Sequence, residues 1–198
     1  MDQNKIRLSA PQAAEPKPSL KRKVHGLETP WFGRQRPPLE QGNAFTHVPA
    51  RQKLADHVAE YGWHCVNVPA EKDAAQYSYT VGLYKSYKHP ELIIFGLPAL
   101  AGYLVMQKLV GSILRGRPLN LAAPADMLFE GPPCQIVRVP VLKYDRYASI
   151  CREYYKGYGF PLYQIVWPTL NGQFPWDEDA PQSLRNNQPV LGHMRAMR

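Results

Sequence analysis

Residues 79–98 read YTVGLYKSYKHPELIIFGLP, and this stretch decides the fold. Its first part alternates large apolar residues with small or polar ones, which is typical of a half-buried strand, so we predict a strand over 76–84. Its last part, 92–97, is a continuous apolar run and predicts a strand at the centre of a sheet. Between them, His89 and Glu91 flank Pro90 in what we expect to be a short loop, a kind of segment that often carries functional residues.

Apolar spacing on either side of this stretch predicts the other elements. A helix is expected over 49–61, where apolar residues recur at helical spacing and Gly62 follows. The remaining predicted elements are strands over 63–68, 134–142 and 163–167 and helices over 98–115 and 144–156. Pro140 favours a strand end or an edge position, and 174–176 is expected to fold back beside the last strand. Helices and strands that mix without a regular βαβ repeat indicate an α+β fold, a mainly antiparallel mixed sheet flanked by about three helices.

Residues 1–48 differ from the rest of the chain in composition. The first 50 residues hold seven of the 20 prolines and show no sustained helical or alternating pattern, so we predict an extended, partly disordered arm. A single α+β domain is expected over 49–192, because 198 residues suffice for one core with an appendage. Residues 193–198 would then form a C-terminal tail.

The net charge of +8 is concentrated in the arm. Residues 1–53 hold 10 of the 24 Lys and Arg and 4 of the 16 Asp and Glu, a net charge of +6 against +2 for the remainder. A basic arm favours a nucleic acid or an acidic protein surface as partner, with Lys21, Arg22 and Lys23 as its densest cluster; the alternative is a solvated tail. Trp31 and Phe32 form an apolar island that would dock on the domain or on a partner.

Composition also bounds the compartment. No apolar run approaches the roughly 20 residues that a membrane-spanning helix needs, and the N-terminus lacks the pattern of a secretory signal. Cys65, Cys134 and Cys151 are far apart and form no Cys-x-x-Cys pair, which is typical of reduced, buried thiols. We therefore expect a cytoplasmic protein without a membrane partner.

Three residues are candidates for catalysis: His64, His89 and Glu91. On a strand, His64 would share a face with Val66 and lie opposite Cys65, so a His–Cys dyad is not expected. His64 at a pocket rim would act as a general base or a ligand; the alternative is a hydrogen-bonded core histidine. With His89 and Glu91 it could also complete a two-histidine, one-carboxylate metal site, although the spacing does not demand one and no metal is assigned.

A second set of residues is suited to holding a ligand. The face of small residues that includes Thr80 and Gly82 allows a ligand to approach closely beside Tyr79; close packing of a helix on the sheet is the alternative. Gln164, Trp167 and Trp176 supply an amide and flat aromatic faces for a planar ligand, with core packing as the alternative. The sequence assigns no cofactor.

Four segments together resemble one protein family. They are Gly62-Trp63-His64 and residues 79–83, 89–92 and 164–168, and the family is the bacterial one known as domain of unknown function 4262. The resemblance extends over about 54–191 and leaves the arm outside. It implies a compact bacterial cytoplasmic domain and brings no established activity with it.

Three functional hypotheses follow. The leading one is a domain that binds a small ligand or a protein partner, with a basic arm that adds affinity for a polyanion or an acidic surface. The second is a hydrolase that uses His64, His89 and Glu91, with or without a metal. The third is an interaction protein of a bacterial conflict or phage system that docks through Trp31 and Phe32.

Overall fold

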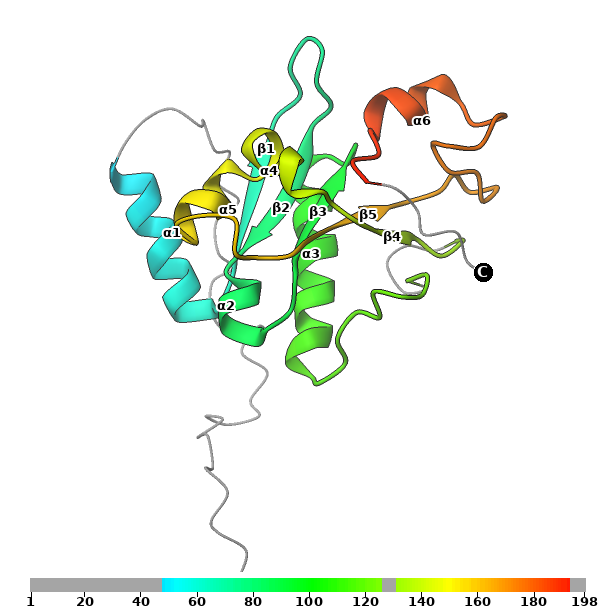
Figure 1. The fold of residues 1–198 in the computed structure, drawn as a ribbon. Coiled ribbons are helices and arrows are strands. Elements are labelled where there is room, and N and C mark those ends of the chain that lie inside the picture. Colours follow the sequence, from blue (N-terminus) through cyan, green and yellow to red (C-terminus); the bar gives the residue numbers. More distant parts are fainter. Residues whose placement is uncertain (1–47, 126–130, 193–198) are drawn as a thin grey trace, which may run out of the picture. The chain divides into compact units, whose positions relative to one another are not determined.

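The computed structural model describes residues 48–125 and 131–192. Within these residues the chain forms a five-stranded sheet in the order β1-β2-β3-β5-β4 (Figure 1). The strands are β1 (His64–Val68), β2 (Tyr77–Val81), β3 (Glu91–Phe95), β4 (Gln135–Arg138) and β5 (Leu162–Val166). Only β3 and β5 run parallel, whereas the other neighbours are antiparallel. The predicted α+β fold with a mainly antiparallel mixed sheet is therefore confirmed.

The helices lie on both faces of this sheet. They are α1 (Val48–Tyr61), α2 (Leu83–Tyr87), α3 (Ala99–Leu114), α4 (Tyr144–Tyr147), α5 (Ser149–Tyr154) and α6 (Gln182–Asn187), with a short 3-10 turn η1 (Val141–Lys143) before α4. In Figure 1, α1, α4 and α5 lie on one side of the sheet and α3 lies on the other. In the part of the chain that the structure describes, no helix has the length and apolar character needed to cross a membrane.

The core is divided into two layers by the sheet. On the α1 and α5 face, Tyr79, Val81 and Ile93 pack with Val58 of α1 and Cys151 of α5. The layer on the α3 face is built from residues of β1, β3, β5 and α3, chiefly Cys65, Leu92, Ile94, Ile165, Met106, Leu109 and Val110. All five residues of β3 are buried, as the continuous apolar run predicts. Each fully buried large apolar side chain contributes about 1.5–3 kcal/mol, so this central strand anchors the domain.

Close packing on the α3 face depends on small residues. A Cβ added to Gly102 of α3 would lie 2.4 Å from the Ser78 Oγ, so the helix approaches β2 more closely than any larger residue would allow. At Ser78, β2 therefore packs closely against helix α3, in line with the helix-packing alternative that the sequence left open. The three cysteines are buried and form no disulfide.

Several predicted boundaries were wrong. The strand predicted over 76–84 ends at Val81, because Gly82 adopts a φ of 102° and the chain continues as α2 rather than as a plain loop. The helix predicted over 144–156 is interrupted at Ala148, whose φ of −142° is not helical. The strand predicted over 134–142 ends at Arg138, followed by Pro140 and the 3-10 turn, and β4 is an edge strand as expected. The segment 174–176, expected to fold back beside the last strand, lies in a stretch of turns, and α6 had no counterpart in the prediction.

Candidate functional site

A fully buried carboxylate, that of Glu91, lies at the start of β3. Its Oε2 accepts a hydrogen bond of 2.6 Å from the Thr80 hydroxyl. Its Oε1 accepts bonds from the backbone N–H groups of Gly82 (2.9 Å) and Tyr84 (3.1 Å) and from the Tyr155 hydroxyl (2.5 Å). Four donors from β2, α2 and the end of α5 thus converge on one side chain, which we call the Glu91 cluster.

The local backbone explains why these donors converge. The positive φ of Gly82 turns the chain out of β2, which directs the N–H groups at the start of α2 toward the carboxylate. Thr80 contributes twice, because its Oγ1 also accepts the N–H of Leu92 at 2.9 Å. A Cβ at Gly82 would lie 2.6 Å from the Val58 Cγ1 of α1, so glycine is required for space as well as for conformation.

Burial dominates the electrostatics of the cluster. It raises the pKa of Glu91 above its ordinary value, and the four hydrogen bonds oppose this shift without cancelling it. Burial and the neighbouring Glu91 charge raise the pKa of Tyr155 well above its ordinary value. Tyr155 therefore stays a neutral donor to Glu91 at physiological pH.

His89 lies beside the cluster in sequence but makes a different contact. Its side chain is 5 % exposed, and its Nδ1 lies 2.8 Å from the Pro90 carbonyl oxygen, which can only accept, so Nδ1 carries the proton. Among the described residues, the buried Nε2 has no hydrogen-bond partner. Burial lowers the pKa of His89, so the ring is neutral near pH 7.

His64 pairs with a histidine that the sequence analysis did not single out. The Nδ1 atoms of His64 on β1 and His57 on α1 lie 3.0 Å apart, and both rings are partly buried. Across the described ranges, no three His, Cys, Asp or Glu side chains form a group that could hold a metal. The structure thus does not assemble the His64, His89 and Glu91 metal site. Catalysis by these three residues stays a prediction.

The predicted ligand-binding residues of β2 belong to the interior. Tyr79 is 2 % exposed and packs in the core, where burial raises its pKa. Thr80 is 0 % exposed and, with Gly82, holds Glu91. As the structure stands, a ligand would reach these residues only by displacing the protein's own contacts.

Gln164 and Trp167 attach the end of the domain to the sheet. The Gln164 amide donates to the Pro189 carbonyl and accepts the Leu191 N–H, each at 2.8 Å. The buried Gln188 amide accepts the Trp167 N–H and donates to its carbonyl, again at 2.8 Å. In this region, side-chain amides make hydrogen bonds to backbone N–H and C=O groups, as the backbone of a neighbouring strand would do.

The two tryptophans have separate surroundings. The Trp167 indole N–H donates to the Phe95 carbonyl at 2.8 Å, which ties it to the end of β3. Trp176 stacks on Phe174 with ring centroids 4.8 Å apart and a 4° angle between the ring planes. Trp167 thus packs on the core layer of the α3 face, whereas Trp176 is half-buried on Phe174, and ligand binding by these residues stays a prediction.

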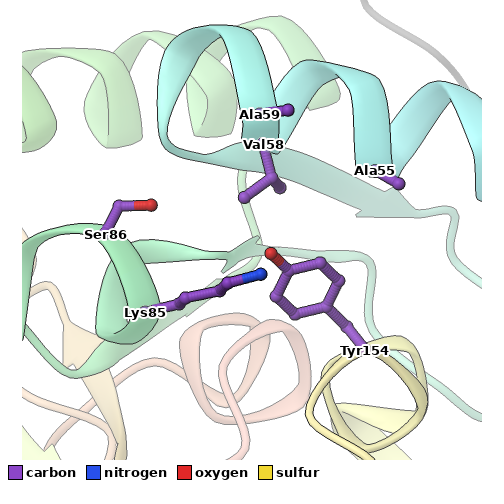
Figure 2. Close-up of a pocket in the computed structure, with 6 residues that line it drawn as sticks. All are labelled: Ala55, Val58, Ala59, Lys85, Ser86 and Tyr154. Atoms are coloured by element: carbon purple, nitrogen blue, oxygen red, sulfur yellow. The ribbon is translucent and has the colours of Figure 1, made fainter.

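A solvent-accessible groove lies between α1, α2 and α5, with a volume of about 190 Å³ (Figure 2). Its lining residues are Ala55, Val58 and Ala59 of α1, Lys85 and Ser86 of α2, and Tyr154 of α5. The Lys85 Nζ lies 5.3 Å from the centroid of the Tyr154 ring, and Figure 2 shows the two side chains extending toward each other. The sequence analysis missed this groove, because its residues come from three segments whose docking no motif encodes.

The groove has a cation and hydroxyl groups on one side and an apolar wall on the other. An acidic group could contact the Lys85 ammonium while an attached carbon chain packs on the small residues of α1. The predicted partner-binding residues Lys21, Arg22, Lys23, Trp31 and Phe32 lie outside the described residues.

In the comparison with protein families, residues 57–181 match the family described as "Domain of unknown function (DUF4262)". The match spans more than half of the chain and includes the Glu91 cluster and the His57–His64 pair. Comparison with curated proteins gave no match. Comparison with solved structures gave none either. The chain therefore belongs to the DUF4262 family, as the resemblance of its motifs indicated.

Proposed function

We propose that this member of the DUF4262 family is a binding domain whose groove between α1, α2 and α5 takes a small anionic ligand, one that carries a carboxylate or phosphate on a short apolar body. The observation that supports this most is the position of Lys85, whose ammonium group stands at the groove beside the Tyr154 ring. Ser86 and Tyr154 add hydroxyl groups to the same lining.

The charge of Lys85 is available to such a ligand. Within 48–125 and 131–192, the ion pairs join other residues: Arg51 to Glu153, and Arg152 to Asp145. A cation whose described neighbour is an aromatic ring gains about 0.5–1 kcal/mol from it at an exposed site, less than a charge-assisted hydrogen bond provides. An anionic ligand would therefore add to this contact.

The backbone of α2 holds the groove side chains in place. The Lys85 N–H donates to the Tyr155 hydroxyl at 3.3 Å, and that hydroxyl donates to Glu91. The first turn of α2 is bonded to Glu91 through Gly82 and Tyr84. Because these hydrogen bonds hold the backbone of α2 that carries Lys85, less conformational entropy is lost when a ligand binds.

The size of the groove limits the ligand. Pockets for drug-sized molecules measure roughly 300–1,000 Å³, whereas this groove measures about 190 Å³. A compound with one acidic group and a few carbon atoms fits this space. A mononucleotide would extend beyond it.

The experiment is a titration of the ¹⁵N-labelled full chain with succinate and, separately, with inorganic phosphate. We expect saturable amide shifts that cluster on α1, α2 and α5. Lys85→Met should weaken the affinity by about 10- to 100-fold, the equivalent of one charge-assisted hydrogen bond. Lys108→Met, which removes another exposed lysine, one on α3, should leave the affinity unchanged. Equal losses in both variants, or shifts spread evenly over the domain, would contradict the proposal.

A further inference from the structure

We infer that His57 and His64 form a binding site for one divalent transition-metal ion, separate from the groove ligand. The two imidazoles face each other from α1 and β1, with their Nδ1 atoms 3.0 Å apart and their ring centroids separated by 5.1 Å. Neutral imidazole nitrogen is a common ligand for Zn²⁺, Cu²⁺ and Ni²⁺. The site rests on this pair alone and does not depend on the proposed function.

The fold sets the approach of the two rings. α1 ends at Tyr61, and Gly62, with a φ of 81°, bonds back to the Val58 carbonyl at 2.9 Å before the chain enters β1. The Tyr87 hydroxyl donates to the Tyr61 carbonyl at 2.9 Å, and a Cβ on Gly62 would lie 2.1 Å from that hydroxyl oxygen. This packed turn fixes the path between the two histidines, so their proximity is preorganised.

The separation of the nitrogens suits a metal. Metal–imidazole bonds are about 2.0–2.1 Å long, so two nitrogens on adjacent coordination positions at a right angle lie about 3 Å apart. The two Nδ1 atoms are already 3.0 Å apart. With these bond lengths, each lone pair would turn by roughly 45° from the line between the two nitrogens to meet the metal, so both rings rotate when the ion binds.

The proton balance is simple. In the metal-free pair, the Nδ1 of one ring donates its proton to the Nδ1 of the other ring. When the metal binds, that ring gives up its Nδ1 proton and takes one at Nε2. Both rings then offer Nδ1 lone pairs, no electron is transferred, and the proton lost from one nitrogen is taken up by another.

The ligand set points to a moderate-affinity site with open positions. Because the described residues provide no third His, Cys, Asp or Glu in a metal-binding group, water would complete the coordination. Nitrogen ligands select the later first-row ions, with Cu²⁺ the strongest, over Mg²⁺ and Ca²⁺, which prefer oxygen.

The test adds one equivalent of Cu²⁺ to the metal-free full chain and records its electron paramagnetic resonance spectrum, with the affinity for Zn²⁺ measured by calorimetry. We expect hyperfine coupling to two imidazole nitrogens and one Zn²⁺ per chain. His57→Gln and His64→Gln should each lower the Zn²⁺ affinity by more than about tenfold, because even outer-sphere partners of a metal contribute that much. His193→Gln, which removes an imidazole from outside the described residues, should not.

Nitrogen-detected NMR of the unmodified protein keeps the test decisive if a variant fails to fold. Zn²⁺ should move the Nδ1 resonances of His57 and His64 together and leave that of His89 in place. Coupling to one nitrogen only, an unchanged affinity in both variants, or Nδ1 resonances that Zn²⁺ does not move would overturn the inference.

Discussion

The two sides of α2 use polar groups in opposite ways. Toward the sheet, the N–H groups of Gly82 and Tyr84 bond to the buried Glu91, whose oxygens contact donors of the protein itself. Toward solvent, the side chains of Lys85 and Ser86 line an open groove. The difference shows that a polar residue in an unusual place, such as a buried carboxylate, need not be a binding residue. Burial and satisfied hydrogen bonds mark groups that hold the fold, whereas exposed charges without an acidic neighbour are free to bind.

The strongest test of this comparison is Glu91→Ala. The substitution leaves four donors without their acceptor, and each orphaned buried group costs about 1–3 kcal/mol, so we expect a loss of at least about 3 kcal/mol in the free energy of unfolding. Urea denaturation measures it. Glu91→Gln keeps one accepting oxygen and should lose less than the alanine variant. A cost below about 1 kcal/mol for Glu91→Ala would remove the structural role and return this carboxylate to the catalytic hypothesis.

A smaller effect is expected for Tyr155→Phe. The change removes the hydroxyl that donates to Glu91 and accepts the Lys85 N–H, so the free energy of unfolding should fall by about 1–2 kcal/mol. The matched control is Tyr158→Phe, because the Tyr158 hydroxyl bonds to the exposed Asp145 and its loss should cost less than about 0.5 kcal/mol. Thermal and urea unfolding of the three proteins compare them directly. Equal costs at the two tyrosines would mean that burial does not distinguish them.

The pH dependence of stability should show the smallest effect. Burial raises the pKa of Glu91 in the folded state above its ordinary 4.5. Its stabilising contribution is therefore fully present below the unfolded value and is lost as the pH rises through the raised folded value. Relative to Glu91→Gln, the unmodified protein should lose stability as the pH rises above 4.5 toward neutrality. A difference that changes in the opposite direction would show that the four hydrogen bonds outweigh burial.

Local patterns in the sequence predicted the sheet well. The apolar run over 92–97 marks β3 because a strand that is buried on both faces is rich in apolar residues, and Glu91 at its start is the polar exception. The break at Gly82 was missed, since nothing in the alternation 77–83 shows that the chain adopts a positive φ there. Ala148 is a similar case, because its backbone is not helical although no helix-breaking residue marks the position.

The candidate site was less predictable, because its groups meet through tertiary contacts. The sequence indicates Glu91 as an acidic residue in a polar segment, but one of its hydrogen-bond donors, Tyr155, is 64 positions away in the sequence. The sequence does not indicate that His57 lies beside His64. The two are seven residues apart, and their side chains meet here because the chain turns directly from α1 into β1. The groove required the docking of three helices, and no local pattern carries that information.

The hydrogen bonds made by the side-chain amides of Gln164 and Gln188 indicate where the folded domain ends. The family match stops at residue 181, yet residues 188–191 satisfy the polar groups of β5 and of Trp167. A Cβ on Gly192 would lie 2.1 Å from the Arg138 carbonyl oxygen, so the chain still presses on the edge strand one residue further on. A gene shortened to the region of family similarity would therefore encode a sheet with unpaired groups along its last strands. For this protein, the stretch that matches the family is shorter than the stretch whose contacts complete the domain.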